Sequence, residues 1–122
     1  MNIYKSIFPT LLVLGSSLAN AQPLNNDQFA KQMIKYIDTS TLYWNQYIEA
    51  SNKNENREIL IEKLCRSKEA IYDVMFNANK YPHLPAAKDA FKHAKQIDWS
   101  LANELNTLNS NQNECTKYMF NN

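Results

Sequence analysis

Apolar side chains recur every three, four or seven positions along most of the chain, which is the spacing of one face of an α-helix. In residues 27–50 the side chains with this spacing are Phe29, Met33, Ile37, Trp44 and Ile48. In residues 56–78 they are Leu60, Leu64, Ile71, Met75 and Ala78. In residues 85–108 they are Ala87, Phe91, Ala94, Ile97, Leu101, Leu105 and Leu108. The pattern predicts three long amphipathic helices.

Three asparagine-rich segments, Asn52–Asn56, Asn77–Asn79 and Asn109–Asn113, mark the ends of these stretches. Asparagine tolerates the left-handed backbone conformation that turns need. Either Asn26 or Asp27 is expected to cap the first helix, because both side chains accept hydrogen bonds from the free N–H groups of a first turn. We therefore place the element boundaries at these asparagines.

Short polar side chains interrupt the first stretch at Asp38–Thr41. Asp, Ser and Thr compete with the helix for backbone hydrogen bonds. A kink or a break at this point is therefore the alternative to one continuous helix.

The segment Tyr81–Pro85 joins the second stretch to the third and contains two prolines. Pro85 suits a first helical turn, where its missing N–H costs nothing. Inside a continuous helix, Pro82 alone would cost about 3 kcal/mol. We expect a stiff corner here, and hence an antiparallel up-down-up bundle.

The first 21 residues have the layout of a secretory signal peptide. Lys5 precedes an apolar run over Ile7–Leu18, and the small residues Ala19 and Ala21 follow it. The run is shorter than the roughly 20 residues of a membrane-spanning helix, so a permanent anchor is the weaker alternative. We expect cleavage before Gln22, export to the periplasm or the medium, and no membrane insertion of the mature protein.

The remaining residues, 22–122, are enough for a single domain. The whole chain has a net charge of +1, and removal of Lys5 with its segment leaves 12 basic against 12 acidic residues. This balance argues against a nucleic-acid-binding protein, which needs a basic surface. The one glycine, Gly15, lies in the signal segment, which disfavours a sheet with tight hairpin turns. The expected fold class is all-α.

An exported domain with two cysteines, Cys65 and Cys115, is expected to form one disulfide. If the third helix runs back along the second, the residue level with Cys65 is close to Trp99. A straight helix would then carry Cys115 about 24 Å beyond its partner, since each residue adds about 1.5 Å. The helix must therefore end before Cys115, and Glu114–Phe120 is expected to fold back as a short fourth helix.

The sequence contains no motif for catalysis, thiol exchange, haem attachment or phosphate binding. Asp89 and His93 lie four residues apart, but the neighbouring lysines would repel a metal ion. Glu58 and Glu62 have the same spacing and are expected to be solvated. We expect neither an enzyme nor a cofactor or metal site.

Two surfaces are candidates for recognition of a partner. Tyr36, Tyr43 and Tyr47 form a stripe on the first helix, and tyrosine is enriched in protein interfaces. The alternative is that this stripe packs inside the bundle. The second surface is the corner at residues 80–84, where Tyr81, His83 and Leu84 lie on a preorganised turn. The alternative there is a stiff connector with no binding role.

Three functions fit an exported, neutral, helical domain with one disulfide. The first is a protein that binds and inhibits another exported protein, an enzyme or a toxin. In size, signal and disulfide alone, the chain is similar to periplasmic immunity proteins and inhibitors of envelope-directed enzymes. The second is a periplasmic stress or chaperone protein, and the third is a helical bundle that binds a small ligand.

Overall fold

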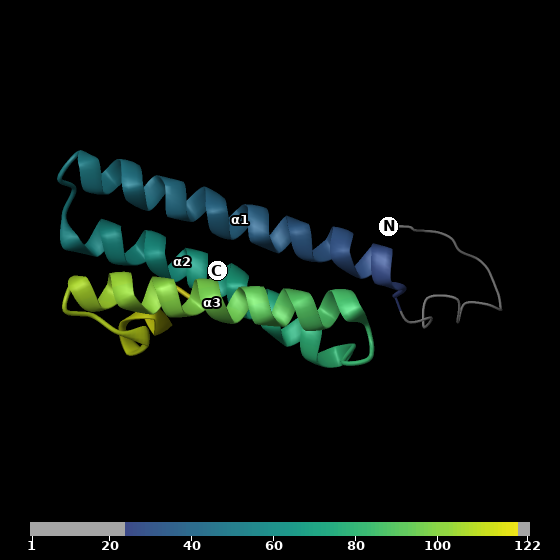
Figure 1. The fold of residues 1–122 in the computed structure, drawn as a ribbon. Coiled ribbons are helices and arrows are strands. Elements are labelled where there is room, and N and C mark those ends of the chain that lie inside the picture. The colour runs from purple at the N-terminus through teal and green to yellow at the C-terminus, as the bar shows by residue number, and fades with distance from the viewer. Residues whose placement is uncertain (1–23, 120–122) are drawn as a thin grey trace, which may run out of the picture.

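The structure, a computed structural model, describes residues 24–119, which form the predicted up-down-up bundle (Figure 1). Its elements are α1 (Asn26–Asn52), α2 (Arg57–Lys80), α3 (Pro85–Thr107) and the short 3-10 helix η2 (Gln112–Lys117). Among these residues there is no strand, and no helix is apolar and long enough to cross a membrane. The expected signal peptide, residues 1–21, lies outside the described residues.

The helix starts depend on asparagine side chains. The cap of α1 is Asn25 rather than the expected Asn26 or Asp27. Its Oδ1 accepts a hydrogen bond from the Gln28 N–H at 2.8 Å, and the Gln28 side chain accepts one from the Asn25 N–H at 3.1 Å. This reciprocal pair satisfies two N–H groups that the helix leaves free. Asn56 caps α2 through a single bond, in which its side chain accepts from the N–H of Ile59 at 3.0 Å.

The helix α1 continues without a break through Asp38–Thr41, so the alternative of a break there is wrong. Ser40 does not compete for the backbone of α1, because its side chain is buried against α2. Its Oγ lies 2.7 Å from the Oγ of Ser67, and the Ser67 hydroxyl donates to the Ser40 carbonyl oxygen at 2.9 Å.

The core forms where the predicted apolar faces meet, with α2 in contact with both other helices. Ile48 is an exception: it was expected in the core and is 40% exposed. The preceding residue, Tyr47, occupies the inward position instead. Neighbouring residues on a helix point about 100° apart, so only one of the two can face the core. The fully buried large apolar side chains are Phe29, Ile61, Leu64, Ile71, Val74, Leu101 and Leu105.

Asparagine makes the turns, as predicted. Asn54 and Asn109 both have a φ of 56°, the left-handed conformation, and they lie just after α1 and α3. The boundary expected at Asn77–Asn79 is wrong, because this segment lies inside α2, which continues to Lys80. The end of α2 is set by the corner prolines, and α3 begins at Pro85 as expected.

The disulfide Cys65–Cys115 is confirmed, with a Cα–Cα distance of 5.2 Å. As predicted, α3 ends before Cys115, and the chain reverses at Asn109. The short C-terminal helix is present, but it is of the 3-10 type and spans Gln112–Lys117 rather than Glu114–Phe120. Phe120 lies outside the described residues, whereas Met119 is buried in the core.

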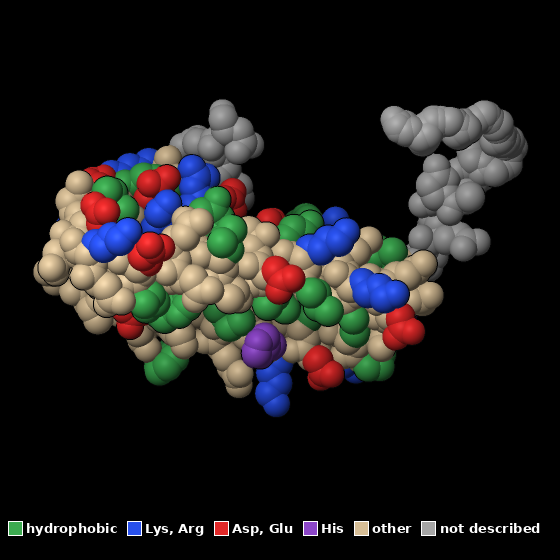
Figure 2. Space-filling view, turned by 90° about the horizontal axis from the view of Figure 1, so that it is seen from above, with side chains coloured by type: hydrophobic (Ala, Val, Ile, Leu, Met, Phe, Trp, Pro, Cys, Tyr) green, Lys and Arg blue, Asp and Glu red, His purple; other side chains and the backbone are tan. Residues whose placement is uncertain are grey.

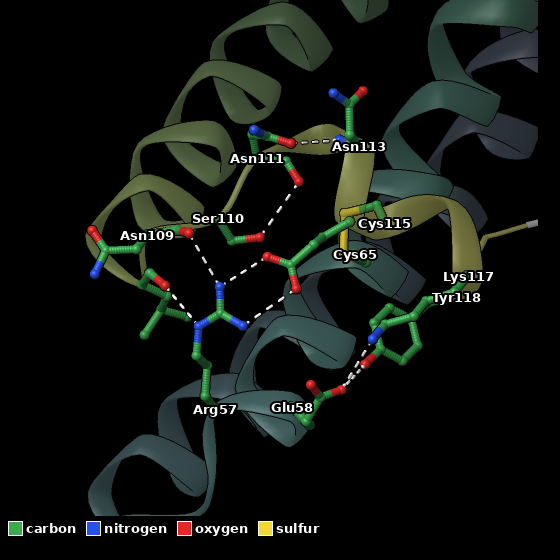
Figure 3. Close-up of polar contacts among 12 residues, drawn as sticks. Arg57, Glu58, Cys65, Asn109, Ser110, Asn111, Asn113, Cys115, Lys117 and Tyr118 are labelled. Atoms are coloured by element: carbon green, nitrogen blue, oxygen red, sulfur yellow. Dashed lines mark hydrogen bonds and ion pairs between the residues drawn. A yellow bond between two sulfur atoms is a disulfide. The ribbon is translucent and has the colours of Figure 1, made fainter.

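The N-terminal turn of α2 holds the returning chain, as Figure 3 shows. The Arg57 guanidinium donates to the carbonyl oxygens of Leu108 at 2.9 Å and Asn109 at 3.1 Å. It also bonds both carboxylate oxygens of Glu114, at 2.8 and 3.3 Å. These bonds satisfy carbonyls that the end of α3 leaves free. The hydrogen bond from Arg57 lowers the pKa of Glu114.

The next residue of α2, Glu58, makes a second contact with the C-terminal segment (Figure 3). One of its carboxylate oxygens accepts from the Tyr118 hydroxyl at 2.7 Å and from the Lys117 ammonium at 3.2 Å. These two hydrogen bonds, with that from Tyr118 first, lower the pKa of Glu58. Because the groups are exposed, each contact contributes little alone. The buried disulfide is therefore the main link between α2 and the C-terminal segment.

Replacing Cys65 and Cys115 together by alanine should lower the free energy of unfolding by about 4 kcal/mol, the chain-entropy value for a loop of 50 residues. Urea unfolding followed by circular dichroism measures this change. The unaltered protein unfolded under reducing conditions is the control, and it should match the double variant. An unchanged urea midpoint in the double variant would contradict a stabilising role for the disulfide.

Candidate functional site

The corner between α2 and α3 is anchored to the core on its inner side. The Tyr81 ring meets the buried Phe29 ring edge-on, with centroids 5.6 Å apart. The Leu84 N–H donates to the Tyr81 carbonyl oxygen at 3.0 Å, and its side chain is half-buried against the core. Pro82 and His83, between these anchors, are exposed. Of the three predicted corner residues, Tyr81 and Leu84 therefore hold the turn, and His83 faces solvent.

Two further contacts extend and stiffen the corner. The Ala86 N–H donates to the Asn26 side chain at 2.8 Å, which joins the start of α3 to the start of α1. On the last turn of α2, the Lys80 ammonium lies 4.5 Å from the centre of the Phe76 ring. Phe76 is 64% exposed, and it is a candidate contact residue that the sequence analysis missed. We call Phe76, Lys80, Pro82 and His83 the corner surface.

The structure separates the three tyrosines of the predicted stripe. Tyr47 is buried, and its hydroxyl donates to the Glu104 carboxylate of α3 at 2.7 Å. Burial first, and then the hydrogen bond and the charge of Glu104, raise the pKa of Tyr47 to about 12. Tyr36 and Tyr43 are half-buried, and Tyr36 packs against the core. The stripe thus holds α1 to α3 through Tyr47 and offers only part of its surface to a partner.

A cavity of about 230 Å³ opens between α1 and α3, with α2 at its floor. Trp44, Ile97 and Leu101 form its apolar walls, and four hydroxyl side chains complete the lining: Ser40, Thr41, Ser67 and Ser100. This site was not among those predicted from the sequence. The spacing along the sequence could have indicated that Ser40 is buried. Ser40 lies seven residues after Met33 and seven before Tyr47, on the same face of α1 as these two buried side chains.

Lys68 is buried in the interface between α2 and α3. Its ammonium lies 2.5 Å from a carboxylate oxygen of Asp98 and 5.3 Å from the centre of the Tyr72 ring. Burial first, and then the charge of Asp98, raise the pKa of Tyr72 to about 12. A buried lysine needs such a partner, because an unpaired charge in the interior is very costly. The pair therefore fixes α3 at one register along α2.

Among residues 24–119, Trp99 is the most exposed of the large apolar side chains, at 69%. From the sequence, this residue was expected only to lie level with Cys65. The signal for its exposure was its position on the opposite side of α3 from the buried Ala94 and Leu101. With Lys95, Gln96 and Ser100, it lines a separate hollow on the surface of α3.

The described surface mixes both charges and shows no cluster suited to a metal ion. Figure 2 shows Lys, Arg, Asp and Glu crowded together at one end of the bundle, with hydrophobic side chains scattered along its length. Residues 24–119 contain no group of three or more His, Cys, Asp or Glu placed to hold a metal. Asp89 and His93 are both exposed. Glu58 bonds Lys117 and Tyr118, whereas Glu62 lies 3.9 Å from Arg66.

Comparison with known proteins gave no match to a protein family, to a curated protein or to a solved structure.

Replacing Tyr47 by phenylalanine should destabilise the fold by about 1.5 kcal/mol at neutral pH, because the Glu104 carboxylate loses a hydrogen bond in a partly buried place. The raised pKa means that the folded state favours the neutral phenol. The Tyr47 hydroxyl therefore makes its full contribution to the free energy of unfolding below pH 10, the ordinary pKa of tyrosine. This contribution is lost as the pH rises toward about 12, the pKa of Tyr47 in the folded state.

Urea unfolding at a series of pH values measures this effect. The unaltered protein should lose stability more steeply between pH 10 and 12 than the Tyr47→Phe variant. Tyr43→Phe, a half-buried tyrosine on the same helix, is the control and should keep the steep loss. Equal slopes for the unaltered protein and Tyr47→Phe would contradict the role given to the Glu104 contact.

Proposed function

We propose that the mature protein is an exported inhibitor that binds another exported protein, as an immunity protein or an inhibitor of an envelope-directed enzyme does. The observation that carries this proposal is the corner surface, an exposed turn held rigid from below. Tyr81 packs on Phe29 and Leu84 is half-buried, while Pro82 and His83 remain exposed between them. A rigid, exposed turn of this kind is suited to entering the active cleft of an enzyme.

The rigidity of the corner favours tight binding. A segment that is ordered before it binds loses little conformational entropy when it enters a cleft. The two prolines fix backbone angles, and the bond from Ala86 to Asn26 holds the base of the turn. The exposed Phe76 ring under Lys80 adds an apolar contact of the type that dominates binding energy at interfaces.

Two features support a site of action outside the cytoplasm. The first 21 residues have the pattern of a secretory signal. The buried disulfide suits an oxidising compartment such as the periplasm. An inhibitor in this place would meet enzymes that attack the envelope, and its mechanism would be steric occlusion, with no chemistry of its own.

Affinity capture with the oxidised protein tests this proposal, using lysates and secretions of its own species and of competing bacteria. We expect one exported enzyme bound at a ratio of one to one, whose activity falls when the protein is added. The variant His83→Glu should weaken this binding by about 30-fold, which corresponds to the roughly 2 kcal/mol of an interface hot spot.

The matched control is His93→Glu, which changes the other histidine, also exposed, in the middle of α3. It should bind the partner as the unaltered protein does. Capture of many unfolded proteins would favour the chaperone alternative and overturn the proposal. Equal binding by the two variants would show that the corner is not the contact surface.

A further inference from the structure

The cavity between α1 and α3 has a hydrogen-bonding character that follows from its serine hydroxyls. Ser67 gives its one hydroxyl proton to the Ser40 carbonyl oxygen at 2.9 Å. The short contact of 2.7 Å between the two hydroxyls must therefore have Ser40 as its donor. Ser100 gives its proton to the Gln96 carbonyl oxygen of its own helix at 3.2 Å. The three serine hydroxyls thus retain lone pairs but have no proton left to donate, whereas the exposed Thr41 hydroxyl of the lining makes no hydrogen bond within the described residues.

Two of these acceptors are held in place inside the protein, whereas Ser100 is exposed. Ser40 is 3% exposed and Ser67 is fully buried, so the pair is fixed at the floor of the cavity. The walls are apolar, with the half-buried Trp44 ring from α1 and Ile97 from α3. Among the described residues that line the cavity, none has a charged side chain. The nearby carboxylates of Asp98 and Glu104 are engaged by Lys68 and Tyr47.

From these features we propose that the cavity binds a small, neutral aromatic molecule with a single hydrogen-bond donor, between phenol and indole in size. A cavity of about 150 Å³ accommodates benzene, so the volume of about 230 Å³ leaves room for a hydroxyl group or a second ring. The ring packs against Trp44 and Ile97, and its O–H or N–H group donates to the Ser40 hydroxyl oxygen. The absence of charged lining residues disfavours an anion or a cation, whose desolvation would not be compensated.

This site is independent of the proposed function as an inhibitor. The corner surface lies at the end of the bundle where α1 begins, whereas Ser40 and Trp44 lie in the second half of α1 (Figure 1). A ligand in the cavity therefore leaves the corner surface open. Each of the two proposals can fail without the other.

Titration of the oxidised protein with indole, phenol and benzene, followed by two-dimensional NMR of the backbone amides, tests the inference. We expect shifts at Ser40, Trp44, Ser67 and Ile97, with a Kd for indole on the order of 0.1 mM. Benzene has no donor and should bind about fivefold more weakly than phenol. The variant Thr41→Trp, at an exposed lining position, should fill the cavity and weaken indole binding by at least tenfold.

The matched control is Thr39→Trp, an exposed threonine two residues away on the same helix that does not line the cavity. It should bind indole as the unaltered protein does. Ser100→Trp fills the cavity from α3 and replaces Thr41→Trp if that variant does not fold. Three results would each overturn the inference: no shifts at ten times the expected Kd, equal indole binding by the filled and control variants, or equal binding of benzene and phenol. His83→Glu should leave indole binding unchanged, which separates this test from that of the corner.

Discussion

The disulfide between Cys65 and Cys115 determines how the rest of the bundle is arranged. Cys65 lies within α2 and Cys115 near the end of the chain, so α3 has to stop and the chain has to return to α2. The left-handed Asn109 makes this reversal, and Arg57 bonds the carbonyls on both sides of it. As a result the C-terminal segment packs on α2, which α1 and α3 also contact.

The central position of α2 leaves α1 and α3 with little direct contact. Two hydrogen bonds join them, from Ala86 to Asn26 near the corner and from Tyr47 to Glu104 near the other end. Between these bonds the gap is lined partly by hydroxyl groups, and it remains open as a cavity. The cavity therefore follows from the central position of α2, which keeps α1 and α3 apart along this stretch.

The helices and their order could be predicted because each depends on local patterns. Apolar spacing gives the faces, Pro85 gives the start of α3, and the reach of a disulfide gives the end of α3. The polar interior could not be predicted from such patterns. Ser40, Ser67 and Lys68 are buried only because each finds a partner on another helix. The corner could be predicted as stiff because its prolines are local. The contact of Tyr81 with Phe29, which anchors the corner, joins distant parts of the sequence and could not be predicted.

The charge distribution bears on how an inhibitor of this form would reach high affinity. Two ion pairs, Arg57–Glu114 and Lys117–Glu58, join α2 to the C-terminal segment, and the whole chain carries a net charge of only +1. Attraction over a distance would therefore add little to the rate of association, which for unsteered pairs is about 10⁵–10⁶ M⁻¹s⁻¹. Tight binding would have to come from slow dissociation. A rigid corner is suited to this, because its contacts break together rather than one at a time, and the bond from Ala86 to Asn26 carries that rigidity into α1.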